Sequence, residues 1–179
     1  GLEVEFSYPL NADGESHTGR MDRMVRSRTD TLLYIMEHKS SGEHPNAFFK
    51  RYILDPKITG YVWGAEQLFQ EPIAGVIMNA LFKPRMNPPK KDGTQTLGQP
   101  SYMRETFIRT KVEIEEWMDE TVEKHRRLRE TIRRYDTGER NVFTKREQSC
   151  VRYGRTCEFI KVCEHQQADF IMEEFRHVD

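Results

Sequence analysis

The sequence predicts a mixed α/β fold, and three observations carry this prediction. Residues 2–10 alternate apolar and polar side chains, which is the period-two pattern of a half-buried strand. The runs at residues 31–39 and 73–82 are largely apolar, as strands buried within a sheet are. Between these two runs, Asp55 and Pro56 give the N-cap and first-position signals of a helix. A sheet with at least one helix packed on it is therefore expected.

The first forty residues are predicted to form a three-stranded antiparallel meander. Residues 11–16 read as a turn after the first strand. The second and third strands are predicted at residues 18–26 and 31–39, and the polar residues 27–30 make the turn between them.

A helix and a fourth strand are predicted to follow the meander. Residues 47–54 read as a short amphipathic piece. The helix that starts at Pro56 is expected to run to about Gln70, because Pro72 comes directly after Glu71 and stops it. The run at residues 73–82 then supplies the fourth strand.

The second half of the chain is predicted to be mostly helical. Residues 83–100 hold four of the eight prolines and read as a mobile loop. Residues 103–135 are predicted to form a long helix that ends at residues 136–138. A short helix is expected at residues 166–176.

Length and composition limit the architecture and the function. With 179 residues, 36% hydrophobic and 32% charged, the chain can bury one substantial core. A single domain is predicted, made of a core at 1–100 and a helical extension at 101–179. The formal net charge is −1, so any surface that binds nucleic acid must be a local patch. No apolar run approaches the roughly 20 residues of a membrane-spanning helix.

Asp22, Glu37 and Lys39 are the candidate functional residues. Strands joined by the turn at 27–30 can bring Asp22 beside Glu37, and Lys39 lies on the same strand face as Glu37. Two carboxylates held close together repel unless a cation neutralises them. Two carboxylates and an ammonium are what metal-assisted phosphodiester hydrolysis uses. A surface ion-pair edge without a metal is the alternative.

These residues resemble the motifs of the PD-(D/E)XK nuclease superfamily, in particular its RecB-like and phage exonuclease-like branch. Gly19-x-x-Asp22 is similar to the second motif of that family, and Glu37-His38-Lys39 to the third. The resemblance implies a restriction-endonuclease-like core of about four strands flanked by helices. The family's helix before the first strand has no counterpart here. The chain also begins at Gly1, so it is expected to be a fragment or processed product.

The resemblance implies a role for each motif residue. Asp22 and Glu37 would bind Mg²⁺ or Mn²⁺ together with the backbone carbonyl of His38, and Lys39 would position or deprotonate the attacking water. The His38 imidazole is expected to face away from the metal.

A further motif of the family, Gln-x-x-x-Tyr, is matched by Tyr61 but has Lys57 in place of Gln. Lys57 is expected to contact a phosphate or to be a solvated helix residue. Tyr61 is expected either at the catalytic site or simply packed on the sheet.

The chain has three cysteines, an odd number that fits metal binding or reduced thiols better than a disulfide framework. Cys150, Cys157 and Cys163 resemble the C-terminal part of the iron–sulfur cysteine cluster in RecB-like members. A 4Fe–4S cluster would need a fourth ligand, which the resemblance places before the missing helix, with His165 as a substitute. Three partly buried thiols are the alternative.

Two basic segments are candidates for holding the DNA backbone. Lys83, Arg85, Lys90 and Lys91 lie in the segment 83–100. The run from Lys124 to Arg134 is the second, although acidic residues precede it and favour a solvated helix with internal ion pairs.

The sequence thus predicts a metal-dependent DNA nuclease. The resemblance implies an exonuclease of DNA recombination, repair or processing in the cytoplasm of a bacterial or phage-infected cell, with recombination or helicase proteins as partners. The first alternative is a non-catalytic nucleic-acid-binding or scaffold module on the same fold. The second is an unrelated α/β interaction domain.

Overall fold

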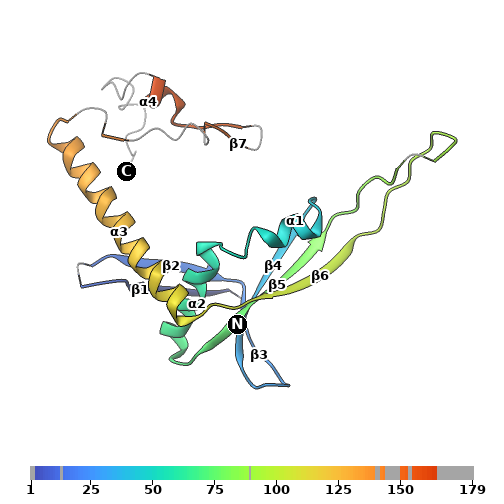
Figure 1. The fold of residues 1–179 in the computed structure, drawn as a ribbon, viewed down its shortest axis with the longest axis horizontal. Helices are drawn as coiled ribbons and strands as arrows, with labels where there is room; N and C mark the ends of the chain where they lie inside the picture. The colour runs from blue at the N-terminus through green and yellow to red at the C-terminus, as the bar shows by residue number, and fades with distance from the viewer. Residues whose placement is uncertain are drawn as a thin grey trace. The chain divides into compact units, whose positions relative to one another are not determined.

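A computed structural model describes residues 3–12, 14–88, 90–139, 142–143, 150–152 and 155–164. Contacts divide the chain into two compact units, Gly1–Val122 and Glu123–Asp179. The first unit is a mixed α/β fold with a four-stranded mixed sheet, a two-stranded sheet and flanking helices, which confirms the predicted fold class (Figure 1).

The described residues of the first unit form six strands in two sheets. Their bounds are β1 Val4–Pro9, β2 Ser16–Met21, β3 Arg23–Arg26, β4 Leu33–Ser41, β5 Ile73–Phe82 and β6 Ser101–Phe107. β1 and β2 form an antiparallel pair, and the larger sheet has the order β3-β4-β5-β6. Within it β4 and β5 are parallel, while β3 and β6 are antiparallel to their neighbours.

Two helices connect the parallel strands β4 and β5, because parallel neighbours need a crossover. α1 spans Pro45–Lys50 and α2 spans Pro56–Phe69. The predicted start of α2 is confirmed: the Asp55 carboxylate accepts a hydrogen bond from the Lys57 N–H at 2.9 Å, with Pro56 at the first position. The helix ends at Gln70, whose φ of 54° is left-handed.

The ring of Phe6 fixes how closely α2 approaches β1 and β2. Phe6 is buried between Gly19 of β2 and Gly64 of α2. A Cβ added at Gly19 would lie 2.5 Å from Phe6 Cζ and 3.3 Å from Tyr61 Cε1, and one added at Gly64 would collide with the same ring. Glycine at these two positions therefore makes room for an aromatic ring between helix and sheet.

The predicted three-stranded meander is wrong at Asp22, where residues 18–26 divide into β2 and β3 in different sheets. The Asp22 N–H donates to Glu37 Oε1 at 3.0 Å, and the Asp22 carboxylate accepts from the His38 N–H at 2.7 Å. These side-chain bonds replace ladder bonds at this residue, so the strand is interrupted where the candidate site lies.

The predicted long helix at 103–135 is wrong in its first part. β6 occupies Ser101–Phe107 and pairs with β5, so residues beyond 100 belong to the sheet. α3 spans Lys111–Asp136. It begins with a capping box, in which the Thr110 N–H donates to Glu113 Oε2 at 2.7 Å and the Glu113 N–H donates to Thr110 Oγ1 at 3.2 Å. The predicted end holds, because Gly138 after the helix has a φ of 87°.

Residues 83–88 and 90–100, within the segment predicted to be a loop, form a paired arm that continues β5 and β6 away from the sheet (Figure 1). Met86 and Leu97 make an antiparallel bridge. On either side of it, the Asn87 N–H donates to Thr96 O at 2.8 Å and the Gly98 N–H donates to Arg85 O at 2.7 Å. We call residues 83–100 the arm.

The second unit contains the later half of α3, a short hairpin and a short helix. The hairpin pairs β7, Val151–Arg152, with β8, Arg155–Thr156, and α4 spans Ile160–Glu164. The helix predicted at 166–176 lies outside the described residues. Among the helices of the described part, none is long and apolar enough to cross a membrane.

Candidate active site

The structure brings Asp22, Glu37 and Lys39 together. Arg23 of β3 is opposite Met36 of β4, which sets Asp22 beside Glu37. Lys39 Nζ lies 2.9 Å from Glu37 Oε2 and 3.9 Å from Asp22 Oδ2. With the 3.0 Å bond from the Asp22 N–H to Glu37, every pair of the three residues is in contact. We call this group of two acidic residues and one lysine, Asp22, Glu37 and Lys39, the acidic trio site.

The acidic trio site has a buried floor and an open rim. The Glu37 side chain is 2% exposed, whereas those of Asp22 and Lys39 are 39% and 32% exposed. A buried carboxylate is costly unless it is paired and hydrogen-bonded, and Lys39 together with the Asp22 N–H meets that need. A ligand can therefore reach Asp22 and Lys39 from solvent while Glu37 stays fixed below them.

The charge of Lys39 is set by its neighbours. Burial lowers the pKa of Lys39, but the hydrogen bond and charge of Glu37 outweigh it. The charges of Asp22 and Tyr61 act in the same direction, so the pKa lies above its ordinary value. Lys39 is then an ammonium at neutral pH. It can donate hydrogen bonds to a water or a phosphate oxygen, but in this state it cannot take up a proton.

The donor set fits a hard divalent cation such as Mg²⁺ or Mn²⁺. Each Glu37 oxygen accepts one described hydrogen bond, which leaves a second acceptor site on each. Within the described residues, no group of three or more His, Cys, Asp or Glu side chains is placed to hold a metal. Mg²⁺ is commonly bound by one or two carboxylates plus waters and substrate phosphates, so two carboxylates are sufficient for this ion.

The His38 side chain belongs to the other face of β4. His38 Nδ1 lies 3.1 Å from Asn79 Nδ2 of β5, and Arg104 Nε of β6 lies 3.4 Å from Asn79 Oδ1. His38 is exposed while its neighbour Glu37 is buried, as the alternation of a strand requires. The imidazole therefore lies away from the acidic trio site, and only the backbone of His38 contacts it.

α2 carries Tyr61, which lies near Lys39, and Lys57, which lies over the Tyr61 ring. Tyr61 is buried and packs edge-on against Phe6, with 6.4 Å between the ring centroids. It also lies close enough to Lys39 to raise the pKa of that residue. Lys57 Nζ lies 5.1 Å from the centre of the Tyr61 ring, within the range of a cation–π contact. Tyr61 is thus both a core residue and a neighbour of the acidic trio site.

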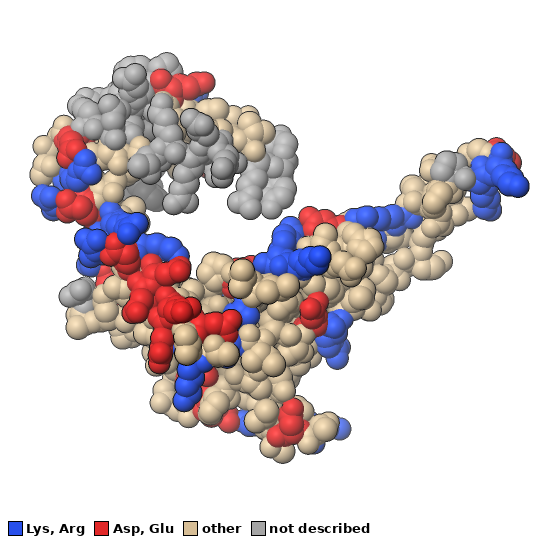
Figure 2. Space-filling model, viewed as in Figure 1, with Lys and Arg blue, Asp and Glu red and all other residues tan. Residues whose placement is uncertain are grey.

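The basic residues of the arm lie apart from the acidic trio site. Arg85 Nε donates to the Gly42 carbonyl oxygen at 2.8 Å, and the Lys83 N–H donates to Ser41 O at 2.8 Å, so both residues tie the arm to the end of β4. Lys90 and Lys91 are exposed near the tip of the arm, where Figure 2 shows a group of basic atoms.

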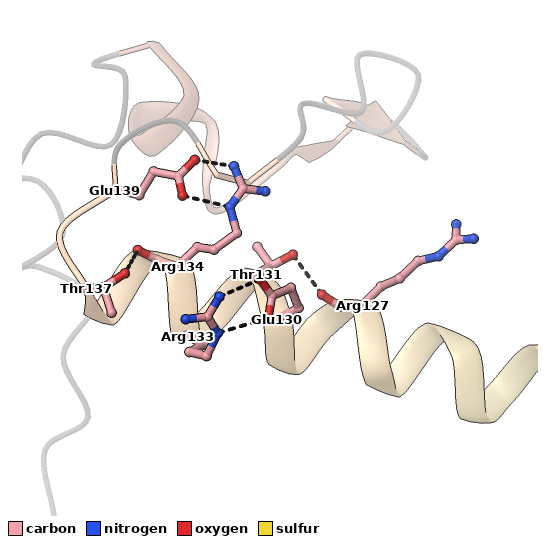
Figure 3. Close-up of polar contacts among 7 residues, drawn as sticks. All are labelled: Arg127, Glu130, Thr131, Arg133, Arg134, Thr137 and Glu139. Atoms are coloured by element: carbon pink, nitrogen blue, oxygen red, sulfur yellow. Dashed lines mark hydrogen bonds and ion pairs between the residues drawn. The ribbon is translucent and has the colours of Figure 1, made fainter.

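Arginines of the basic run in α3 form ion pairs with nearby glutamates, and Figure 3 shows those of Arg133 with Glu130 and of Arg134 with Glu139 beyond the helix end. Arg126 Nε and Arg127 Nε lie 2.7 Å and 2.5 Å from Glu123, and together they hold the pKa of Glu123 at about 2. Arg133 Nη2 lies 2.7 Å from Glu130. The ion pairs match the expected solvated helix with internal pairs. They leave fewer uncompensated positive charges on α3 to bind phosphates.

The cysteines lie in the second unit. Cys150, Cys157 and Cys163 are half-buried, and the Cys157 N–H donates to Cys150 O at 2.8 Å at the end of the β7–β8 hairpin. His165 lies outside the described residues. The iron–sulfur assignment stays a prediction.

Comparisons with known proteins add little to this geometry. No family model matches the chain, and no curated protein matches it. The crystal structure of a protein called SSO0001 has a TM-score of 0.40 and 14% sequence identity, over 68% of this chain and 49% of that one. The chain thus spans about half the length of that protein. At this TM-score the likeness identifies neither a shared fold nor a shared function.

Proposed function

We propose that this protein is a metal-dependent nuclease of the PD-(D/E)XK type that hydrolyses phosphodiester bonds in DNA. One observation carries the proposal: a buried carboxylate, Glu37, is fixed beside a second carboxylate, Asp22, and an ammonium, Lys39, at a rim open to solvent. Two carboxylates and one lysine at a single point provide the charges that hydrolysis of a phosphodiester requires.

Asp22 and Glu37 are the residues that would hold Mg²⁺ or Mn²⁺, with the backbone carbonyl of His38 as a third donor by resemblance. When bound, the ion would supply Lewis-acid stabilisation of negative charge on the phosphate. Glu37 contributes a fixed position, because two hydrogen bonds and burial restrain its carboxylate. Asp22 is restrained by the His38 N–H.

Lys39 is assigned to orientation and charge. Its ammonium, held 2.9 Å from Glu37, would orient the attacking water or a phosphate oxygen. Lys57, above the ring of Tyr61, is proposed to contact a neighbouring phosphate of the substrate.

The finer assignments rest on the family resemblance. These are exonuclease action in DNA recombination, repair or processing, a cytoplasmic location, recombination or helicase partners, and a 4Fe–4S cluster on Cys150, Cys157 and Cys163.

Cleavage of labelled DNA by the wild-type protein tests the proposal. We expect hydrolysis of duplex or single-stranded DNA with Mg²⁺ or Mn²⁺, and none with EDTA, since the carboxylates require a cation to admit a phosphate. Binding without hydrolysis under both metals would instead support the non-catalytic DNA-binding module. The specific observation that favours this second function is Lys57, which stands where the resembled family has Gln.

A further inference from the structure

The arm is a braced element and carries its own charge pattern. The Asn87 side chain donates to Thr96 Oγ1 at 3.0 Å, which ties its two sides together. At the tip, the Lys90 N–H donates to Thr94 O at 2.8 Å, and the Asp92 carboxylate accepts from the Thr94 N–H at 2.9 Å. The Thr94 hydroxyl, which donates to Asp92 Oδ1 at 2.7 Å, and the Thr94 N–H lower the pKa of Asp92 and engage its charge in holding the turn. The arm is therefore a preformed ribbon with a fixed tip.

The charge of the arm is opposite to that of the chain. Residues 83–100 contain four basic residues and one acidic residue, a balance of 4 − 1 = +3, although the whole chain has a net charge of −1. Figure 2 shows blue atoms at the tip and at the root of the arm. A local basic surface on an otherwise near-neutral protein is the electrostatic footprint expected of a phosphate-binding element.

The register of the sheet sets how far the tip lies from the acidic trio site. Lys39 of β4 is opposite Ala80 of β5, and β5 leads into the arm two residues later, after Phe82. Lys90 follows Ala80 by ten residues, which is at most about 33 Å of extended chain at roughly 3.3 Å per residue. One helical turn of duplex DNA is about 34 Å. The basic tip thus lies within about one turn of duplex from the site.

We propose that the arm grips the phosphate backbone of duplex DNA about one helical turn from the bond held at the acidic trio site. This inference rests on the proposed nuclease function and names its substrate as duplex. No Phe, Tyr or Trp occurs in residues 83–100, whereas binding of single strands relies on aromatic side chains that stack on bases. Lysines without aromatic neighbours neutralise phosphates irrespective of sequence.

Within the arm the basic residues divide into two roles. Arg85 donates to the Gly42 carbonyl oxygen, so it fixes the root of the arm to the end of β4 and is a positioning residue. Lys90 and Lys91 are exposed at the tip and are the phosphate contacts. A shallow hollow of about 300 Å³ at the root, lined in part by Lys83 and Arg85, leaves space for the backbone between tip and sheet.

Fluorescence anisotropy measures the affinity of the protein for labelled DNA over a series of salt concentrations. EDTA is present so that no cleavage occurs. The probes are a duplex of about 30 base pairs and a hairpin-closed duplex of about 8 base pairs, shorter than one turn. For Lys90→Ala with Lys91→Ala we expect affinity for the long duplex to fall about tenfold or more near 0.1 M salt. The slope of log K against log[salt] should fall by about 2. Affinity for the short duplex should be unchanged.

The control is Arg28→Ala with Lys111→Ala, which removes the same charge from two exposed positions outside the arm. Equal loss of affinity in both double variants, or equal loss on both duplexes, would overturn the proposal. The result also separates the arm from the proposed activity. If DNA binding depends on the arm but the wild-type protein never cleaves DNA, the proposed nuclease function is wrong and the role of the arm stands. Cleavage with unchanged binding in the Lys90/Lys91 variant would remove the role of the arm alone.

Discussion

Replacing Glu37 by Gln is expected to reduce DNA cleavage at saturating Mg²⁺ by about 10³-fold or more, with the fold retained. Gln has nearly the same shape and keeps an oxygen that can accept the hydrogen bond of the Asp22 N–H. It loses the buried negative charge that holds Lys39 and would hold the cation, and removing such preorganised electrostatics costs on the order of 10²–10³ in rate even for one donor. Single-turnover rates on a labelled duplex measure the effect.

Glu130→Gln is the matched control. Glu130 is an exposed glutamate of α3, paired with Arg133 rather than with the acidic trio site. The same chemical change there should leave the cleavage rate within about twofold, because exposed ion pairs contribute roughly 0–1 kcal/mol. Thermal unfolding of both variants checks that the fold persists. Wild-type cleavage by a folded Glu37→Gln protein would show that hydrolysis occurs elsewhere.

Gly64→Ala is expected to lower the free energy of unfolding by about 2–3 kcal/mol, which is in the upper part of the range for overpacked cores. The added methyl group would overlap the ring of Phe6, which is also confined by Gly19 on the other side. Helix propensity favours Ala over Gly by about 1 kcal/mol, so a net loss would show that packing outweighs propensity here. Urea titration measures the change.

Two variants make this expectation specific. Gly42→Ala adds the same methyl group where no atom lies within 4 Å, and we expect a change of no more than about 0.5 kcal/mol. Phe6→Leu in the Gly64→Ala background removes the overlapping ring atoms, so the two changes should cost less together than the sum of their separate effects. A Gly64→Ala protein as stable as Gly42→Ala would contradict the packing described for Phe6.

The acidic trio site could be predicted because its residues are close in sequence and obey strand alternation. Lys39 follows Glu37 by two residues, so a strand places both on one face. Asp22 lies beside Glu37 because the turn at 27–30 pairs β3 with β4, and this turn is recognisable from the local sequence. The interruption of the strand at Asp22 could not be predicted in this way, since it depends on bonds from residues fifteen and sixteen positions away.

β6 could not be predicted from the local sequence for a different reason. Six of its seven residues are exposed, so the segment lacks the apolar alternation that marks a strand, and its charges resemble those of the helix that follows. Pairing with β5 decides its structure. A local signal did exist for the true start of α3, because Thr110 and Glu113 have the spacing of a capping box.

The arm was predicted to be a loop for a similar reason. Its prolines and polar residues give no strand pattern, yet β5 and β6 hold its two ends side by side and extend their pairing into it. The bond from Arg85 to the Gly42 carbonyl joins residues 43 positions apart, which no local pattern indicates.

Calorimetric titration with Mn²⁺ tests the central claim, that the acidic trio site is a metal centre, most directly. The wild-type protein and Asp22→Asn are compared, with Asp119→Asn, an exposed aspartate of α3, as the control. We predict binding in the micromolar to millimolar range that is retained in Asp119→Asn and lost in Asp22→Asn, since the carboxylates of Asp22 and Glu37 are the charged donors proposed for the ion. No binding by the wild-type protein, or equal binding by all three, would contradict the assignment.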